Sequence, residues 1–68
     1  MSGNELAEVE VDYLRHTAAA VLVRDANDRE IWLPFSTVEY DGDMGDLTSG
    51  DAITLQVQEW IAKKNDLI

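Results

Sequence analysis

The sequence predicts a mainly β domain that ends in a short C-terminal α-helix. Apolar and polar residues alternate over residues 8–13 and again over residues 53–58, which is the period of a strand with one buried face. Over residues 59–68 the apolar spacing becomes helical. We expect a small antiparallel sheet curled toward an SH3-like or OB-like partly open barrel. A flat sheet with one helix on its open face is the alternative.

The first expected strand begins at residue 8 and carries its acids on one side. Residues 1–7 are expected to be a flexible N-terminus, and residues 14–17 a turn. Alternate side chains of a strand point to opposite faces, so one side is predicted to join the core and the other to face solvent. The apolar side consists of Val9, Val11 and Tyr13, and the acidic side of Glu8, Glu10 and Asp12.

Residues 18–23 are apolar on both faces and are expected to form the central strand, covered on both sides. Residues 25–29 are rich in Asp and Asn, which favour turns. The chain should therefore return as a hairpin strand over residues 30–33, with Trp32 on the face opposite its apolar neighbours. Pro34 has no amide hydrogen and should end that strand or lie at a sheet edge.

The second half of the chain is predicted to hold a turn, a loop, a strand and a helix. Ser36 and Glu39 have the spacing of a capping box, which predicts one short helical turn. Residues 40–50 contain three glycines and are expected to form an exposed, mobile loop. The alternating strand follows, and the terminal helix should press Trp60 and Ile61 onto the sheet.

A chain of 68 residues allows one domain, expected over residues 8–68. Such a chain buries only about 60% of the surface that its unfolded form exposes, so small domains commonly need disulfides, a metal or oligomerisation. The chain has no cysteine and one histidine, which excludes disulfides, thiolate metal sites and histidine-rich metal sites. We expect no cofactor, and oligomerisation or close packing is left as the source of stability.

Acidic residues outnumber basic ones by fourteen to five, and the formal charge is −9. Between Arg29 and Lys63 there are seven acids and no base. Nucleic-acid affinity comes mainly from Lys and Arg, and anionic membranes repel the same charge, so neither is an expected partner. A basic protein surface is favoured instead. The alternative is that the charge only confers solubility.

We predict that acids on this β scaffold form a partner-binding surface, which imitates the phosphate charge of a duplex and competes for a basic protein channel. A second candidate surface is apolar and would bind a partner or a second copy in a homodimer. The predicted apolar residues are Trp32, Phe35 and Trp60. The predicted acidic residues are Glu8, Glu10, Asp12, Glu39, Asp41, Asp43, Asp46 and Asp51.

Neither catalysis nor a metal site is expected. Counted from Asp41 as position 1, the sequence has Asp46 where a helix–loop–helix calcium site needs glycine, and Ala52 where it needs a bidentate glutamate. The acids of the first strand should be well hydrated, whereas catalytic carboxylates need a cleft that shifts their pKa. His16 is predicted to be a surface residue in a turn. The aromatic residues lack the basic groove that barrels binding single strands need.

Several short motifs resemble those of small acidic proteins encoded by bacteriophages and prophages. They are Glu30–Pro34 with Ser36, Val38–Glu39, Gly50–Asp51 before an alternating strand, and the ending from Glu59 to Ile68. The resemblance covers about residues 13–68, with Phe35 where a polar or basic residue is expected.

This resemblance implies an accessory protein in the cytoplasm of the bacterial host. Such a protein would bind a host defence or nucleic-acid-handling protein, often as an inhibitor, or would act as an oligomerising structural module. The start of the chain has no secretory signal pattern, and no apolar run reaches membrane length. Both observations agree with the cytoplasmic expectation.

Overall fold

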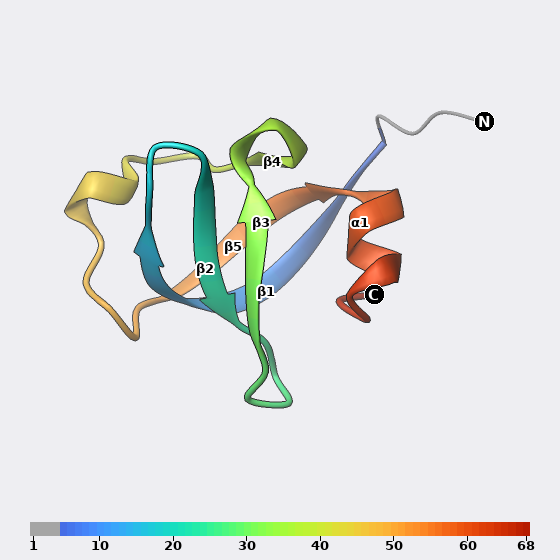
Figure 1. Ribbon diagram of the computed structural model, residues 1–68, viewed down its shortest axis with the longest axis horizontal. Helices are drawn as coiled ribbons and strands as arrows, with labels where there is room; N and C mark the ends of the chain where they lie inside the picture. Colours follow the sequence, from blue (N-terminus) through green and yellow to red (C-terminus); the bar gives the residue numbers. More distant parts are fainter. Residues whose placement is uncertain (1–4) are drawn as a thin grey trace.

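The structure is a computed structural model that describes residues 5–68, and it is a five-stranded antiparallel sheet followed by a short helix (Figure 1). The mainly β class and the C-terminal helix predicted from the sequence are confirmed. The elements in chain order are β1 (Leu6–His16), β2 (Ala20–Arg24), β3 (Glu30–Pro34), the 3₁₀ turn η1 (Phe35–Thr37), β4 (Val38–Glu39), the 3₁₀ turn η2 (Met44–Asp46), β5 (Ala52–Gln58) and α1 (Glu59–Lys64).

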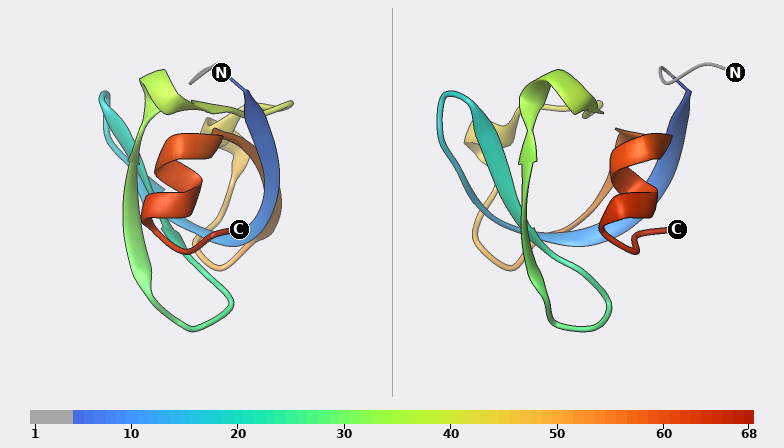
Figure 2. Two further views of the ribbon diagram at one scale, coloured as in Figure 1. Left: turned by 90° about the vertical axis from the view of Figure 1, so that its right-hand side faces the viewer. Right: turned by 45° about the vertical axis from the view of Figure 1, so that its right-hand side comes forward.

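The strands lie in the order β3-β2-β1-β5-β4, so the long strand β1 is the middle of the sheet. The sheet curls strongly but does not close, because β3 and β4 are its two edges and do not pair with each other. The result is the partly open barrel that the sequence predicts. The helix α1 lies at the open side, against β1 and β5 (Figure 2).

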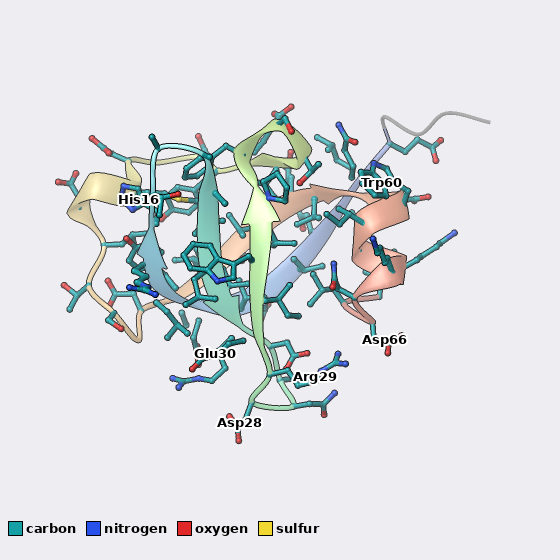
Figure 3. All side chains as sticks on the ribbon, viewed as in Figure 1. His16, Asp28, Arg29, Glu30, Trp60 and Asp66 are labelled. Atoms are coloured by element: carbon teal, nitrogen blue, oxygen red, sulfur yellow. The ribbon has the colours of Figure 1, made fainter. Side chains whose placement is uncertain are left out.

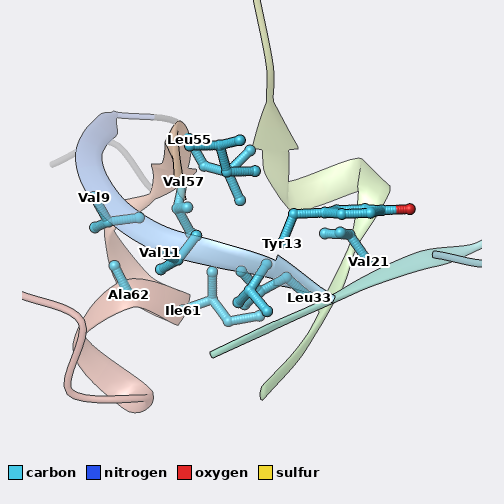
Figure 4. Packing of buried hydrophobic residues seen from close by; sticks show 11 residues of the cluster. Val9, Val11, Tyr13, Val21, Leu33, Leu55, Val57, Ile61 and Ala62 are labelled. Carbon is cyan, nitrogen blue, oxygen red and sulfur yellow. The ribbon is translucent and has the colours of Figure 1, made fainter. Parts of the chain in front are cut away.

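The core is built from the inward faces of β1, β2, β3 and β5 together with two residues of α1 (Figure 4). Alternation in the strands accounts for it, since every second side chain of β1 and β5 is buried. The fully buried side chains of largest volume are Leu33, Leu55, Val21, Val23 and Val57.

The first strand is longer than predicted at both ends. It begins at Leu6, and the carbonyl of Glu5 accepts a hydrogen bond from the amide of Glu59 at 2.8 Å. The prediction of a flexible N-terminus is therefore wrong for residues 5–7, and its remainder lies outside the described residues. The predicted turn at residues 14–17 is also wrong, because an irregularity between Tyr13 and Arg15 lets the pairing with β2 continue to His16.

Strand β2 starts two residues later than expected and is second from the edge, so the prediction that it is the central strand is wrong. The prediction that both faces are covered is confirmed, because Val21, Leu22 and Val23 are all buried. Leu22 lies between Arg15 and Trp32 in the sheet register, on the face opposite the core. Trp32 therefore points outward, as predicted.

The hairpin between β2 and β3 is organised by the carboxylate of Asp25. Its Oδ1 accepts the amide hydrogens of Asn27 and Arg29, both at 2.9 Å, and its Oδ2 accepts Nε of Arg29 at 2.9 Å. The Arg29 amide, followed by the guanidinium and the Asn27 amide, holds the pKa of Asp25 below its ordinary value despite burial. Asp28 has a φ of 62° at the tip. The predicted turn is confirmed with its expected Asx chemistry.

Arg29 also ties this hairpin to the C-terminal end of the chain (Figure 3). Its Nη2 donates to the carbonyl of Asn65 at 3.0 Å, and its Nη1 lies 3.8 Å from a carboxylate oxygen of Asp66. These contacts hold two segments together that are far apart in sequence.

The region after β3 differs from the prediction in three ways. Ser36 does not cap a helix, because it lies inside η1, and that turn is held instead by Thr37 Oγ1 donating to the Pro34 carbonyl at 2.7 Å. The two-residue strand β4 was not predicted from the sequence. The loop over residues 40–50 is not simply exposed, because its apolar side chains pack against the core. They are Tyr40, Met44 and Leu47.

The helix α1 ends at Lys64, four residues before the predicted end. Asp66 takes a left-handed φ of 57°, and the amides of Asp66 and Leu67 bond back to the carbonyls of Lys63 and Ala62. This is a Schellman ending, which stops a helix.

The predicted packing of Trp60 onto the sheet is wrong. Strand β5 runs into α1 without a loop, and this start turns Ile61 and Ala62 inward while Trp60 stays 50% exposed. The indole nitrogen of Trp60 donates to Gln58 Oε1 at 2.7 Å.

Candidate functional site

The candidate site is the outer face of β1, β5 and β4, opposite the core. The acids of β1 alternate with its buried residues and so point outward. Glu8 lies beside Gln56 of β5, and Gln56 lies beside Glu39 of β4. Two carboxylates from segments thirty residues apart in sequence therefore flank one glutamine in a row across three strands.

A hollow of about 440 Å³ lies along this row. It is bordered by three acidic residues, Glu8, Glu39 and Asp41, by Tyr40, and by Thr54 and Gln56 of β5. The hollow suits a cationic side chain better than an apolar one, because its charged groups are all negative.

Glu10 and Asp12 border a second hollow of about 420 Å³, which also reaches Thr54. Arg24 lies in this hollow, with its Nε 3.6 Å from Asp12 Oδ2. Both side chains are more than a third exposed, so the pair is solvent-screened and weak. It nevertheless reduces the negative potential at Asp12.

We call Glu8, Glu10, Glu39 and Asp41 the acidic face. Within residues 5–68, none of the four forms an ion pair with a Lys, Arg or His side chain. Asp12 belongs to the same surface but is paired with Arg24. The structure thus brings together five of the eight acids predicted from the sequence.

The other three predicted acids lie on the loop that carries η2. Asp43 Oδ1 accepts the amide of Gly45 at 2.8 Å and thereby caps η2. Asp51 Oδ2 accepts the amide of Thr48 at 2.8 Å. These two carboxylates have a local structural role, which sequence spacing did not reveal. Asp46 is exposed within η2.

The three predicted apolar residues do not form one surface. Trp32 is 44% exposed on the outer face of β3, with the Arg15 guanidinium 5.5 Å from its ring centre. Trp60 is exposed on α1. Phe35 is partly buried and packs against the core and the ring of His16. Leu6 and Ile68, which the sequence did not single out, are also exposed.

The single histidine lies at the end of β1 and not in a turn. Its Nδ1 is 2.6 Å from the hydroxyl of the buried Tyr13. Within residues 5–68, no three His, Asp or Glu side chains are grouped so that they could hold a metal ion.

Sequence reasoning missed the residues between the carboxylates. Thr54, Gln56 and Tyr40 line the hollow, and the first two could have been found, because alternation in β5 puts them on the outer face. The position of Tyr40 depends on where β4 ends, which the sequence does not indicate.

Comparison with protein-family models, curated proteins and solved structures found no match to this chain. Among residues 5–68, no helix has the length and apolar character needed to cross a bilayer.

Proposed function

We propose that this chain is a non-enzymatic protein-binding module whose acidic face binds a basic surface of another protein. The proposal includes a phage accessory role in the bacterial host cytoplasm, where a nucleic-acid-handling or defence protein would be the partner. An inhibitor of this kind occupies the basic surface that would otherwise hold phosphates.

The observation that carries the proposal is that, within residues 5–68, no cationic side chain forms an ion pair with the acidic face. Arg29 is engaged by Asp25 and the C-terminal turn, and Arg15 lies over Trp32. Lys63 and Lys64 are on the last turn of α1. Arg24 alone borders the acidic surface, beside Asp12. The four carboxylates of the acidic face therefore have no ion-pair partner among residues 5–68.

Such a surface supports association with a cationic protein in two ways. Long-range attraction steers the encounter and raises the association rate, and this effect falls steeply as salt rises. At contact, each exposed ion pair contributes roughly 0.2–1 kcal/mol. Four such pairs amount to about 0.8–4 kcal/mol, which corresponds to a change in affinity of about fourfold to several hundredfold.

The test is capture from a bacterial lysate at low salt with three immobilised proteins. One is the wild type, and one is a face variant with Glu8→Gln, Glu10→Gln, Glu39→Gln and Asp41→Asn. The third is a charge-matched control, in which four exposed acids outside the acidic face become amides: Glu5→Gln, Asp28→Asn, Glu30→Gln and Asp46→Asn. Each variant changes the formal charge from −9 to −5, because four acids are neutralised.

Mass spectrometry of the salt eluates gives the result. We expect one or a few basic proteins that the wild type and the control retain and the face variant loses. Equal retention by all three proteins would contradict the proposal, because net charge or another surface would then be responsible.

A second candidate function is an oligomerising accessory module whose acids only confer solubility. Trp32 and Trp60 favour it, because both are about half exposed in the monomer. Sedimentation of the wild type from low to high concentration tests it. A single monomeric species throughout would contradict this second function, whereas a dimer lost on Trp32→Ala or Trp60→Ala would support it.

A further inference from the structure

The strand β5 has a stretch of open edge within the candidate site. Tyr13 donates its amide to the Asp51 carbonyl at 2.7 Å, and Glu59 donates to Glu5 at 2.8 Å. In an antiparallel pair the main-chain bonds to one neighbour recur at every second residue. The main-chain groups of the odd-numbered residues from 51 to 59 therefore form hydrogen bonds with β1. The main-chain groups of Thr54 and Gln56 point to the opposite edge of β5, on which β4 lies.

That other edge is covered at Gln56 and open at Thr54. Gln56 pairs with Glu39 of β4, and the pairing goes no further along β5. The next partner in this register would be Asp41, but residues 41 and 42 form a bend. Within residues 5–68, the amide and carbonyl of Thr54 form no hydrogen bond at this edge.

The chain leaves β5 after Glu39, and the next residue, Tyr40, turns toward the core. Its ring packs against the core cluster. The backbone of Gly42 passes so close that a Cβ there would lie 2.8 Å from Tyr40 Cε2. The hollow of about 440 Å³ lies where β4 diverges from β5, between Tyr40 and Asp41 on one side and Thr54 and Gln56 on the other.

We propose that an extended, lysine- or arginine-bearing segment of the partner protein adds to β5 at Thr54 as a short strand. An open edge of this kind is a ready template for strand addition, in which main-chain hydrogen bonds supply affinity and side-chain contacts supply specificity. The choice of a basic segment follows from charge complementarity, because Glu8, Glu39 and Asp41 border the hollow. The inference rests on the proposed function and specifies how its partner docks.

A second copy of this chain is a poor occupant of the same edge. Its formal charge is −9, and it would bring a second set of carboxylates close to Glu8, Glu39 and Asp41 at the hollow. Like charges opposed across a strand pair are destabilising.

The test uses a hexapeptide that alternates lysine and valine, with amide spectra of the ¹⁵N-labelled full chain as the readout. We expect the Thr54 amide signal to shift and its hydrogen exchange to slow as the peptide is added. The same peptide with N-methyl groups on alternate residues keeps its charge but loses donors on one edge. We expect about tenfold weaker binding from that analogue.

A pair of variants tests the protein side of the contact. Thr54→Pro removes the outward amide hydrogen without changing the charge. Proline is tolerated in an edge strand where the N–H group forms no hydrogen bond within the sheet. We expect Thr54→Pro to weaken peptide binding about tenfold, whereas Thr48→Val, at an exposed threonine outside the hollow, should bind as the wild type does. Amide spectra of each variant confirm that it is folded, and the methylated peptide provides the same test if Thr54→Pro is not.

The possible outcomes separate this inference from the proposed function. Binding that is lost in the face variant but insensitive to N-methylation overturns strand addition and leaves the acidic face as the contact. Capture of a basic lysate protein without any binding of the hexapeptide would also overturn strand addition and leave the acidic face as the contact. Protection of Thr54 that grows with protein concentration, without peptide, overturns the inference in favour of a second copy. Failure of every basic protein and peptide to bind overturns both.

Discussion

Shortening Ile61 to alanine should show how far α1 stabilises the open barrel. Ile61 is 7% exposed and packs with Val9, Val57 and Leu33 in the core. Ile61→Ala removes three buried carbon groups at about 0.8 kcal/mol each. The cavity adds to that loss, so about 3 kcal/mol in total is expected, within the usual range of about 2–5 kcal/mol.

This loss is large for so small a domain. A folding free energy of about 0.05–0.15 kcal/mol per residue gives about 3–10 kcal/mol for 68 residues. Urea unfolding followed by circular dichroism measures the change, together with Ile61→Val, which should cost about 0.5–1.5 kcal/mol. Lys63→Ala, on the exposed side of the same helix, is the matched control and should stay within about 0.5 kcal/mol of the wild type.

The result that would refute this reasoning is a loss below about 1 kcal/mol for Ile61→Ala. The helix would then be only loosely attached, and the barrel would be stable without it. A loss for Lys63→Ala equal to that for Ile61→Ala would also refute it, since the effect would then come from helix formation in general.

Three further predictions concern individual carboxylates. Glu39→Gln should leave stability unchanged or raise it by up to about 0.3 kcal/mol at low salt, because Glu39 faces Glu8 across β5. Asp43→Ala should instead cost about 0.5–1 kcal/mol, because it removes the cap of η2. Urea unfolding of both variants measures the two effects, and a loss for Glu39→Gln as large as that for Asp43→Ala would contradict the prediction. Asp25 has a lowered pKa in the folded chain, so the stability it contributes is fully present above its ordinary pKa of 3.8 and is lost as the pH falls through the lower folded pKa. The difference in unfolding free energy between the wild type and Asp25→Asn should therefore shrink below pH 3.8. A difference that grows below this pH would contradict the prediction. Asp66→Gly should raise stability by about 0.5–1 kcal/mol, because glycine adopts the left-handed φ of 57° without strain. Thermal unfolding measures the change, and a lower midpoint than the wild type would mean that the lost contact with Arg29 outweighs this gain.

Much of the fold follows from the period of the apolar residues. Alternation identifies β5 within one residue of its observed start, and it also identifies the buried face of β1. The turn chemistry of Asp25 and its neighbours identifies the hairpin between β2 and β3. These features are local, so a single sequence contains them.

The errors come from contacts between distant segments. The continuation of β1 to His16 depends on pairing with β2 across an irregularity, and β4 exists only because two residues find β5. The exposure of Trp60 depends on where β5 becomes α1, since one residue of difference rotates the helix by about 100°.

The candidate site was predictable in part for the same reason. The outward direction of Glu8, Glu10 and Asp12 follows from alternation alone. The pairing of Asp12 with Arg24 and the local roles of Asp43 and Asp51 depend on register and on turn geometry. Acidic residues that look alike in the sequence thus differ in the structure, because some carboxylates are free to bind a partner and others hold local structure.

The most direct test of the central claim is a calorimetric titration of the lysate protein that the wild type captures. It would be measured against the wild type, the face variant and the charge-matched control, at about 10 mM and about 150 mM salt, where the Debye length falls from about 30 Å to about 8 Å. Our account predicts that the control binds nearly as the wild type does, that the face variant binds at least about fourfold more weakly at low salt, and that the difference in affinity narrows at high salt. Affinities that agree among all three proteins, or that do not change with salt, would contradict the claim that the acidic face is the binding surface.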